Sequence, residues 1–586
     1  MYSAFNSVFY ILTYLLLFSA FILVKKSDNK LNFVVYMPIY IMLMMLFSTF
    51  FAGIIDIIGI PVNLVTLGIG NLIGTMCISL YILKKGEIQA YYFKIYDLIS
   101  IIIITIIIGF VAKEQFGVNL MMNYETTDPT RHLRMAQELI ESGKLGIMYF
   151  ASLNNATIIS VGLGFLKPFW SYKLFVLADI IMLWLSATLL FSISDFFAKK
   201  TFAKIISLVS IVFYVLGYPL NNMVFGFVYL GMGVSICAYL IFVANNYYNG
   251  FIKEGIAIVA MMLGCFGMIN CYSLFAPFVF ISLAIFIAIK FIKNKKLFCK
   301  EFFITEFSIF LIPTLFGLYY SFFRLFEGGV SDVGNSLSVE GYIYRDLYSS
   351  FIIILPAAIY GLIIAFAKRE IKIHHILLLV FGISTVFMFA LGLRGIVSSY
   401  YFYKMYYMLS LLCFVTAIEG ICDLCNKSVS SVISYSLVWV FMAIMNFAFI
   451  DDRITQNNVL MSPSSWHSGA FFSIYEFNLN AIKSRNMSSA KVELYEKAFD
   501  LVNDEEAVTL LDTTEPIYWF EPFIQRDLRE FYCYNFDECD LDDYRKKLEK
   551  CSYLVVPLNF DDRFIDFIEK NECVFENSEG YIYIIS

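Results

Sequence analysis

Residues 95–112 read IYDLISIIIITIIIGFVA, a run of 18 residues in which Asp97 carries the only charge. A run of this length and composition can cross the hydrocarbon of a bilayer as a helix. Lipid offers the backbone no hydrogen-bonding partner, so a single crossing segment satisfies its polar groups only as a helix. Similar apolar runs recur on both sides of this one, and we therefore predict a polytopic α-helical membrane protein.

The whole chain has the composition of a membrane protein. Of its 586 residues, 60% are hydrophobic and only 15% are charged, with a mean hydropathy of +0.73. A soluble domain of this length has too small an interior to bury so many apolar side chains. We predict about fourteen spanning helices, at residues 5–24, 32–53, 61–83, 95–112, 171–194, 203–220, 223–246, 254–270, 272–292, 302–321, 349–367, 373–393, 401–420 and 430–449.

Charge divides the chain near residue 450. Residues 451–586 hold 27 Asp and Glu against 13 Lys and Arg, whereas the rest of the chain holds 21 acids and 29 bases. In this acidic part, helix signals alternate with strand signals, as in a small C-terminal α/β soluble domain. Its acidity excludes a nucleic-acid partner. The expected helices are 490–502, 541–550 and 560–570, and the expected strands are 507–511, 553–557, 573–575 and 581–585.

The distribution of lysine predicts the orientation in the cell membrane. Short cytoplasmic loops of membrane proteins are enriched in Lys and Arg. If the predicted helices alternate, five basic loops fall on one side, at 25–30, 84–85, 199–204, 290–300 and 368–372. That side is then cytoplasmic. The N-terminus, the loops 113–170, 322–348 and 394–400, and the soluble domain are then extracytoplasmic.

The long external loop 113–170 contains a helix signal. Asp128 followed by Pro129 predicts an N-cap and a first helical residue, and Ser142-Gly143 predicts the end of the helix. An apolar stripe on this helix predicts that it lies along the membrane surface. The apolar stretch 153–170 is interrupted by Asn, Gly and Pro. We interpret this stretch as interfacial or re-entrant.

The first candidate site is the segment 124–132 (YETTDPTRH), just outside the fourth predicted helix. Asp128 and His132 are four residues apart and share a helix face. A carboxylate here could orient or deprotonate an acceptor hydroxyl, with Glu125 close by. Arg131 and Arg134 could hold a phosphate. Alternatively, Asp128 only caps the helix, because Asp before Pro is a favourable N-cap.

The second candidate site is the segment 394–404 (RGIVSSYYFYK). Arg394 lies at the outer end of the twelfth predicted helix, and Lys404 lies one turn inside the thirteenth. A lysine at that depth is costly unless it reaches water or meets an anion. Two cations beside Tyr400 and Tyr401 suit a lipid phosphate. The alternative is a snorkelling lysine within an ordinary aromatic belt.

Two further places hold polar groups that could bind substrate. Loop 322–348 contains Arg324 and Arg345 among several glycines, and it could close over a substrate. The alternative is a plain surface loop. Asp179 lies inside the fifth predicted helix, and an ionisable residue within a membrane is a candidate site. A structural hydrogen bond to a neighbouring helix is the equal alternative.

Metal-binding patterns are weak in this sequence. The chain has only four histidines, which excludes a histidine-rich metal site. His374 and His375 fall on the predicted cytoplasmic side, where we expect them to be solvated. The pair Cys422 and Cys425 lacks partners of metal-ligand spacing, and we interpret it as packing.

The layout around Asp128 adds a resemblance. A spanning helix leads to an external loop with an Asp, then an amphipathic helix (DPTRHLRMAQELIESGKLG, 128–146), an apolar stretch with Pro, many helices joined by short loops, and an external soluble domain. This resembles the GT-C superfamily of membrane glycosyltransferases, and the likeness covers residues 95–450. Residues 1–94 would then be an N-terminal addition of spanning helices, and residues 451–586 an extracytoplasmic α/β domain.

The resemblance implies an inverting hexosyl- or pentosyltransferase. In that superfamily the donor is a polyprenyl-phosphate-linked sugar, and transfer occurs on the outer face. The acidic residue of the first external loop works at the acceptor, which implies Asp128 as the catalytic residue and Arg394 and Lys404 at the lipid phosphate. The acceptor would be a cell-envelope glycan, a glycolipid or a protein. This sequence departs from the metal-dependent members of the superfamily, because no paired acidic motif lies beside Asp128. Glu125, three residues away, could serve as a second acid, so a divalent metal is possible but not favoured.

Two other functions use similar groups. A transporter or flippase of lipid-linked glycans would show internal repeats, broken helices and ionisable groups at the midplane. The sequence shows no convincing repeat, and its charges gather at the outer rim, which favours the enzyme. A polymerase or ligase of cell-envelope glycan would use the same lipid phosphate and transfer a whole chain.

Overall fold

The computed structural model describes residues 3–294, 299–319, 341–345, 351, 354–427, 473–503, 506–513 and 516–585. Within these residues, twelve helices are long and apolar enough to cross a membrane. The fold is therefore that of a polytopic helical membrane protein. These helices are α1 (Ala4–Leu23), α2 (Phe33–Ile57), α3 (Leu64–Lys85), α4 (Ile95–Phe116), α7 (Ser171–Ser194), α8 (Thr201–Leu216) continued by α9 (Tyr218–Phe225) as one span, α10 (Val228–Tyr248), α11 (Glu254–Cys271), α12 (Ala276–Lys293), α13 (Lys300–Leu318), α17 (Ile373–Gly392) and α18 (Ser399–Lys427).

The predicted spans agree with these helices apart from their boundaries. The predicted span 349–367 corresponds to the shorter helix α16 (Leu355–Lys368), and the span 430–449 lies outside the described residues. The predicted span 223–246 begins too early. Here a separate short helix, α9 (Tyr218–Phe225), ends at Gly226, whose backbone has a φ of +70°. This left-handed turn separates α9 from α10, and glycine adopts it without steric cost.

Local signals explain where individual spans begin and end. The Asn63 side chain accepts hydrogen bonds from Val65 N and Thr66 N at the start of α3, and Thr66 closes a capping box. At the other end, Gly86 adopts the left-handed conformation after Lys84 and Lys85. Cations at the C-terminus of a helix interact favourably with its dipole. Gly86 therefore ends the helix, and the two lysines before it mark its basic end.

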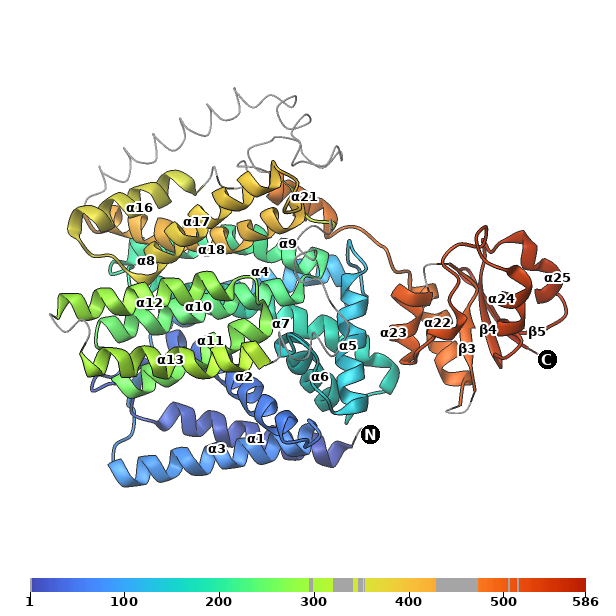
Figure 1. Ribbon diagram of the computed structural model, residues 1–586, viewed down its shortest axis with the longest axis horizontal. Coiled ribbons are helices and arrows are strands. Elements are labelled where there is room, and N and C mark those ends of the chain that lie inside the picture. The colour runs from blue at the N-terminus through green and yellow to red at the C-terminus, as the bar shows by residue number, and fades with distance from the viewer. Residues whose placement is uncertain are drawn as a thin grey trace.

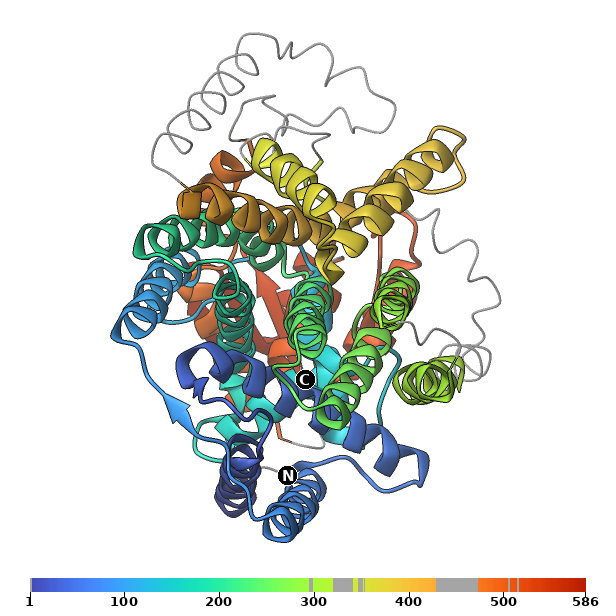
Figure 2. The same ribbon diagram turned by 90° about the vertical axis from the view of Figure 1, so that its left-hand side faces the viewer.

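The basic loops gather at one end of the helix bundle. Glu87 pairs with both Lys25 (3.3 Å) and Lys253 (3.1 Å), and the Lys200 ammonium donates to the carbonyl of Asn426 at 2.7 Å. The N-terminus and the soluble domain lie at the opposite end (Figure 1). Figure 2, turned by 90°, shows many of the spanning helices nearly end-on, with strands of the soluble domain behind them. The assignment of the basic end to the cytoplasm stays a prediction from the lysines.

Loop 113–170 forms three helices at the end of the bundle opposite the basic loops: α5 (Asp128–Ser142), α6 (Phe150–Leu163) and the short η1 (Pro168–Trp170). Helix α5 runs across the direction of the spanning helices (Figure 1). The beginning of α6 bonds to α2, since the Tyr149 hydroxyl donates to the carbonyl of Thr49 at 3.0 Å. Its last turns bond to the start of α1, since the Ser7 hydroxyl donates to the carbonyl of Ser160 at 3.4 Å. Helix α6 is therefore packed among spanning helices and does not cross the bundle.

The soluble domain is a small α/β unit. Its four-stranded sheet has the order β3-β4-β6-β5, in which β3 and β4 are parallel and the other pairs are antiparallel. The predicted helix 560–570 is only partly helical, because residues 562–564 form a 3-10 turn before α25 (Ile565–Ile568). The other elements are α21 (Ser473–Ala481), α22 (Ser489–Leu501), β3 (Val508–Leu510), α23 (Glu521–Ile524), α24 (Leu541–Leu548), β4 (Tyr553–Pro557), β5 (Glu572–Asn577) and β6 (Gly580–Ile584).

Candidate functional site

Asp128 is the first residue of α5, and it does not cap the helix. The N-cap is Thr127, and no side-chain capping bond forms at this end. The predicted N-cap therefore lies one residue too late, because Pro129 is tolerated at the second helical position as well as the first. The preceding Thr126 fixes the turn: its hydroxyl accepts from Asp128 N at 3.3 Å and donates to the carbonyl of Phe225 at 2.6 Å. The capping interpretation of the Asp128 carboxylate is thus wrong, and the carboxylate is exposed at the helix start.

Lys404 of α18 is surrounded by four aromatic rings, which we call its aromatic cage. Its ammonium lies 3.8 Å from the centre of the Tyr400 ring, 5.4 Å from that of Tyr401, 5.6 Å from that of Tyr272 and 5.7 Å from that of Phe227. The negative faces of aromatic rings attract a cation, more strongly where water is excluded. The cage explains how a lysine is held one turn inside this helix.

Asp128 and Lys404 act on each other across the site. The protein packed around Asp128 removes water from one side of an otherwise exposed carboxyl group and raises its pKa, whereas the positive charge of Lys404 lowers it. The first effect is the larger one. The two residues come from different predicted segments, more than 270 positions apart in sequence. The structure therefore brings Asp128 of the first candidate segment near Lys404 of the second.

His132 completes this group from the same helix face as Asp128. Its ring packs on Tyr229, with the ring centres 4.6 Å apart. Burial lowers the pKa of His132 to about 3, and the positive charges of Lys404 and Arg131 act in the same direction. The imidazole is therefore neutral at physiological pH. Its Nδ1 is buried and has no hydrogen-bond partner within the described part of the chain.

The third candidate segment also reaches this place. A Cβ atom on Gly341 would lie only 2.8 Å from the Tyr400 ring, so the backbone of loop 341–345 passes directly over that ring. Tyr342 packs on Phe225 with ring centres 5.2 Å apart, and the negative charge of Glu125, after burial, helps to raise its pKa. Glu125 and the loop are therefore neighbours. Three segments that are distant in sequence converge at one end of the bundle.

The remaining predicted residues lie around this centre in different ways. Arg131 is exposed and pairs with Glu138 at 3.3 Å, Arg345 donates to the carbonyl of Gly341 at 2.9 Å, and Arg394 is exposed at the end of α17. Arg324 lies outside the described residues. The last of these residues, Arg134, points to the soluble domain.

Asp179 lies beneath the site in α7. Its Oδ2 accepts a hydrogen bond of 3.0 Å from the Tyr124 hydroxyl. It also borders a small internal cavity of about 30 Å³, whose lining includes Asn222 and Phe227. Phe227 is shared with the Lys404 cage. The predicted structural hydrogen bond was to a neighbouring helix, whereas Tyr124 lies between α4 and α5, at the start of the first candidate segment. Asp179 is therefore bonded directly to that segment.

The aromatic residues that complete the site do not stand out in the sequence. Phe227 and Tyr229 flank the start of α10, and Tyr272 follows the end of α11. Their positions at helix ends gave a weak signal. The chain has 61 Phe and 40 Tyr, so an aromatic residue at a helix end is too common to stand out.

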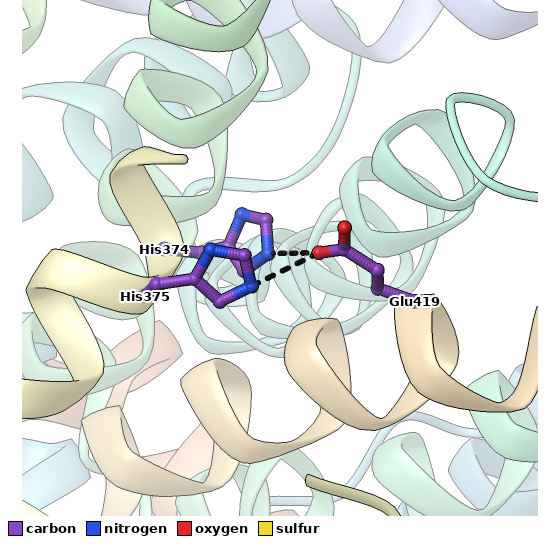
Figure 3. A group of neighbouring side chains, drawn as sticks. All are labelled: His374, His375 and Glu419. Atoms are coloured by element: carbon purple, nitrogen blue, oxygen red, sulfur yellow. Dashed lines mark hydrogen bonds and ion pairs between the residues drawn. The ribbon is translucent and has the colours of Figure 1, made fainter. Parts of the chain in front are cut away.

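A second polar cluster lies in the membrane body, where His374 and His375 of α17 approach Glu419 of α18. Both imidazoles point to the same carboxylate (Figure 3). The His374 Nε2 is 2.7 Å and the His375 Nε2 is 3.1 Å from Glu419 Oε2. Both histidines are completely buried. The expectation that they are solvated is wrong, because their rings face the helix contact.

The hydrogen bonds of this cluster argue against a metal. The Nδ1 of His375 accepts from the backbone N–H of Lys372 at 3.0 Å, so the proton of the neutral ring is on Nε2. A metal ligand needs a free electron pair on that nitrogen. The Lys372 ammonium also lies 2.5 Å from Glu419 Oε1, where it would repel a cation. We interpret the cluster as an ion pair with hydrogen bonds that joins α17 to α18.

Replacing Glu419 with alanine is expected to lower the free energy of unfolding by about 3 kcal/mol, since it leaves the Lys372 charge unpaired. Thermal unfolding in detergent measures this. The matched control is Lys368→Ala, which removes the ion pair between the half-exposed Lys368 of α16 and Asp423 of α18 and should cost less than the loss of Glu419. Added zinc should not stabilise the wild-type protein against unfolding. If zinc did stabilise the wild type and failed to stabilise Glu419→Ala, the cluster would be a metal site.

Comparison with known proteins adds no family. The chain matches no protein-family model and no curated protein sequence. The fold establishes a membrane-embedded protein that contacts the lipid bilayer. Its function must therefore be argued from the geometry of the site.

Proposed function

We propose that this protein is a glycosyltransferase of the GT-C kind, which moves a sugar from a polyprenyl-phosphate-linked donor to a cell-envelope acceptor. The observation that carries the proposal is that the Asp128 carboxylate and the caged Lys404 ammonium lie near enough at one end of the bundle for their charges to interact. A polyprenyl donor dissolves in the bilayer and presents its phosphate at the interface. An enzyme for it needs an interfacial cation with a carboxylate beyond it.

The residues of the site suit the steps of a sugar transfer. Asp128 accepts the proton of the acceptor hydroxyl, whose oxygen forms a bond to the anomeric carbon of the sugar. The bond from that carbon to the donor phosphate breaks on the opposite face, which inverts the configuration. Lys404 stabilises the negative charge of the departing polyprenyl phosphate. His132 stays neutral because of its low pKa and offers a hydrogen bond to a sugar hydroxyl.

Sidedness supports transfer on the outer face. The site lies at the end of the bundle that carries the N-terminus and the soluble domain, away from the basic loops. Basic loops mark the cytoplasmic side of membrane proteins. Cysteine labelling of intact cells tests this: a cysteine placed at position 396 should react with a membrane-impermeant reagent, and one placed at position 84 should not.

One observation favours a flippase of lipid-linked glycans as the alternative. Asp179 is an acid inside a spanning helix, and it borders a cavity beside the interrupted helices α8, α9 and α10. Transporters build their sites from such broken helices and membrane-embedded charges. The charged groups gather at the end of the bundle, however, which suits an enzyme that meets a water-borne acceptor.

Reconstitution separates the two functions. The purified protein in liposomes is given a labelled polyprenyl-phosphate sugar and a mixture of glycan, glycolipid and peptide acceptors. The transferase should release polyprenyl phosphate and move the label to an acceptor. Movement of the intact donor between leaflets, with no cleavage of its sugar–phosphate bond, would refute the transferase and support the flippase.

The pH dependence of transfer should report the pKa of Asp128. The base must be deprotonated, so the rate is lost as the pH falls through this pKa. Because burial raises the pKa, the loss should begin above the value of about 3.9 for an ordinary aspartate. In Lys404→Met the lowering effect of the cation disappears, so the acid limb of the residual rate should move to higher pH. An acid limb that moves to lower pH in this variant would contradict the pairing.

A further inference from the structure

The soluble domain contacts the Asp128 segment at two places, one on each side of it. On the N-terminal side, the Asn486 amide donates to the carbonyl of Tyr124, and Met487 N donates to Asn123 Oδ1 at 3.2 Å. Both contacts come directly before Glu125. They fix the backbone at the point where the chain enters the site.

The second contact lies on α5, beyond Asp128 and His132. Arg134 pairs with Glu521 of α23 at 3.4 Å, and both side chains are only 8% exposed. One turn further, Gln137 Nε2 donates to the carbonyl of Pro522 at 2.8 Å. The Tyr532 hydroxyl donates to Glu521 and holds it in place. The Arg134 guanidinium also donates to Glu141 of its own helix at 2.9 Å, so the contact with Glu521 is a buried charge contact, which restricts geometry more than an exposed one does.

The membrane body supports the same segment from the other side. Glu125 N donates to the carbonyl of Val224 at 3.0 Å, and the Thr126 hydroxyl donates to that of Phe225. These bonds hold the start of the segment, and the Gln137 amide also donates to the Ser171 hydroxyl of α7 at 3.1 Å. Helix α5 lies between the bundle and the soluble domain (Figure 1). Its position therefore depends on both.

We propose that the soluble domain positions the Asp128 segment, with Asn486 and Glu521 as the positioning residues of its two anchors. The domain is then a structural part of the site. The catalytic meaning of this positioning rests on the proposed function, whereas the anchoring itself does not. Loss of either anchor frees one end of the segment and lets Asp128 move away from Lys404.

Hydrogen exchange of the full-length protein in lipid nanodiscs tests the anchors directly. The variants are Glu521→Gln, which keeps the size of the side chain, and Asn486→Ala. In each variant, amides of residues 123–134 should exchange at least about tenfold faster than in the wild type. The spanning helices should keep their protection, which shows that the variant is folded.

The matched control is Glu496→Gln. Glu496 joins the soluble domain to the body through Lys167 at 3.3 Å, outside the Asp128 segment. Exchange of residues 123–134 should be unchanged in this variant. Unchanged exchange in both anchor variants, or an equal increase in the control, would overturn the proposal.

Kinetics then separate positioning from a merely structural role. In Glu521→Gln, kcat for sugar transfer should fall about tenfold while KM for the donor stays the same, because Lys404 is untouched. Faster exchange in the anchor variants together with a wild type that transfers no sugar would support the anchoring and refute the proposed function. Transfer by the wild type together with unchanged exchange in both variants would refute the anchoring alone.

Discussion

Asp128→Asn is expected to lower the rate of sugar transfer roughly a thousandfold, the contribution of a general base. The asparagine has nearly the same size and keeps the hydrogen-bonding shape, but it cannot take the acceptor proton. Donor binding should persist, because Lys404 and its aromatic cage are intact. Transfer of labelled sugar in liposomes measures the rate, and binding of the labelled donor measures the affinity.

The fold of this variant should be unaffected. Asp128 makes no capping bond in α5, and an exposed substitution away from such features changes the free energy of unfolding by less than about 0.5 kcal/mol. The control is Asp542→Asn, because Asp542 is likewise an exposed acid in the first turn of a helix, α24, in the soluble domain. Asp128→Asn with more than a tenth of the wild-type rate would contradict the role of Asp128 as base.

Lys404→Met is expected to weaken donor binding roughly thirtyfold. A hydrogen bond to a charged group contributes about 2 kcal/mol, and a loss of this size corresponds to that factor. Methionine fills a similar volume among the rings but provides no charge for the phosphate. Equilibrium binding of a labelled polyprenyl-phosphate sugar measures the loss. Lys404→Arg should bind more tightly than Lys404→Met, since it keeps the cation.

Lys173→Met is the matched control for this effect. Lys173 also lies over aromatic rings, 4.5 Å from the centre of Trp170, near the same end of the bundle. Its removal takes away a caged lysine without touching the site, so donor binding should not change. Equal losses in the two variants would show that Lys404 contributes only general charge. An unchanged donor affinity in Lys404→Met would show that the donor phosphate does not bind at Lys404.

The candidate site was partly visible in the sequence. Asp128 and His132 were selected because they share one helix face just outside a predicted span, and Lys404 because a lysine inside a span is costly unless it meets an anion. Their meeting was not visible, since the segments are joined only by the packing of α5, α10 and α18. Arg134 shows the opposite case. The sequence suggested that Arg134 binds a phosphate. In the structure Arg134 faces Glu521 of the soluble domain, and this long-range contact is not encoded in the local sequence.

The sequence by itself determined the membrane spans, the basic end of the bundle and the acidic α/β domain. These features depend on the transfer of local apolar runs into lipid and on local charge, and neither requires knowledge of distant neighbours. Only the tertiary structure decided which residues share a site, that His374 and His375 are buried against Glu419, and that the soluble domain holds both ends of the Asp128 segment. Such contacts join residues far apart in the chain, and their energies depend on packing and burial that arise only when the helices assemble.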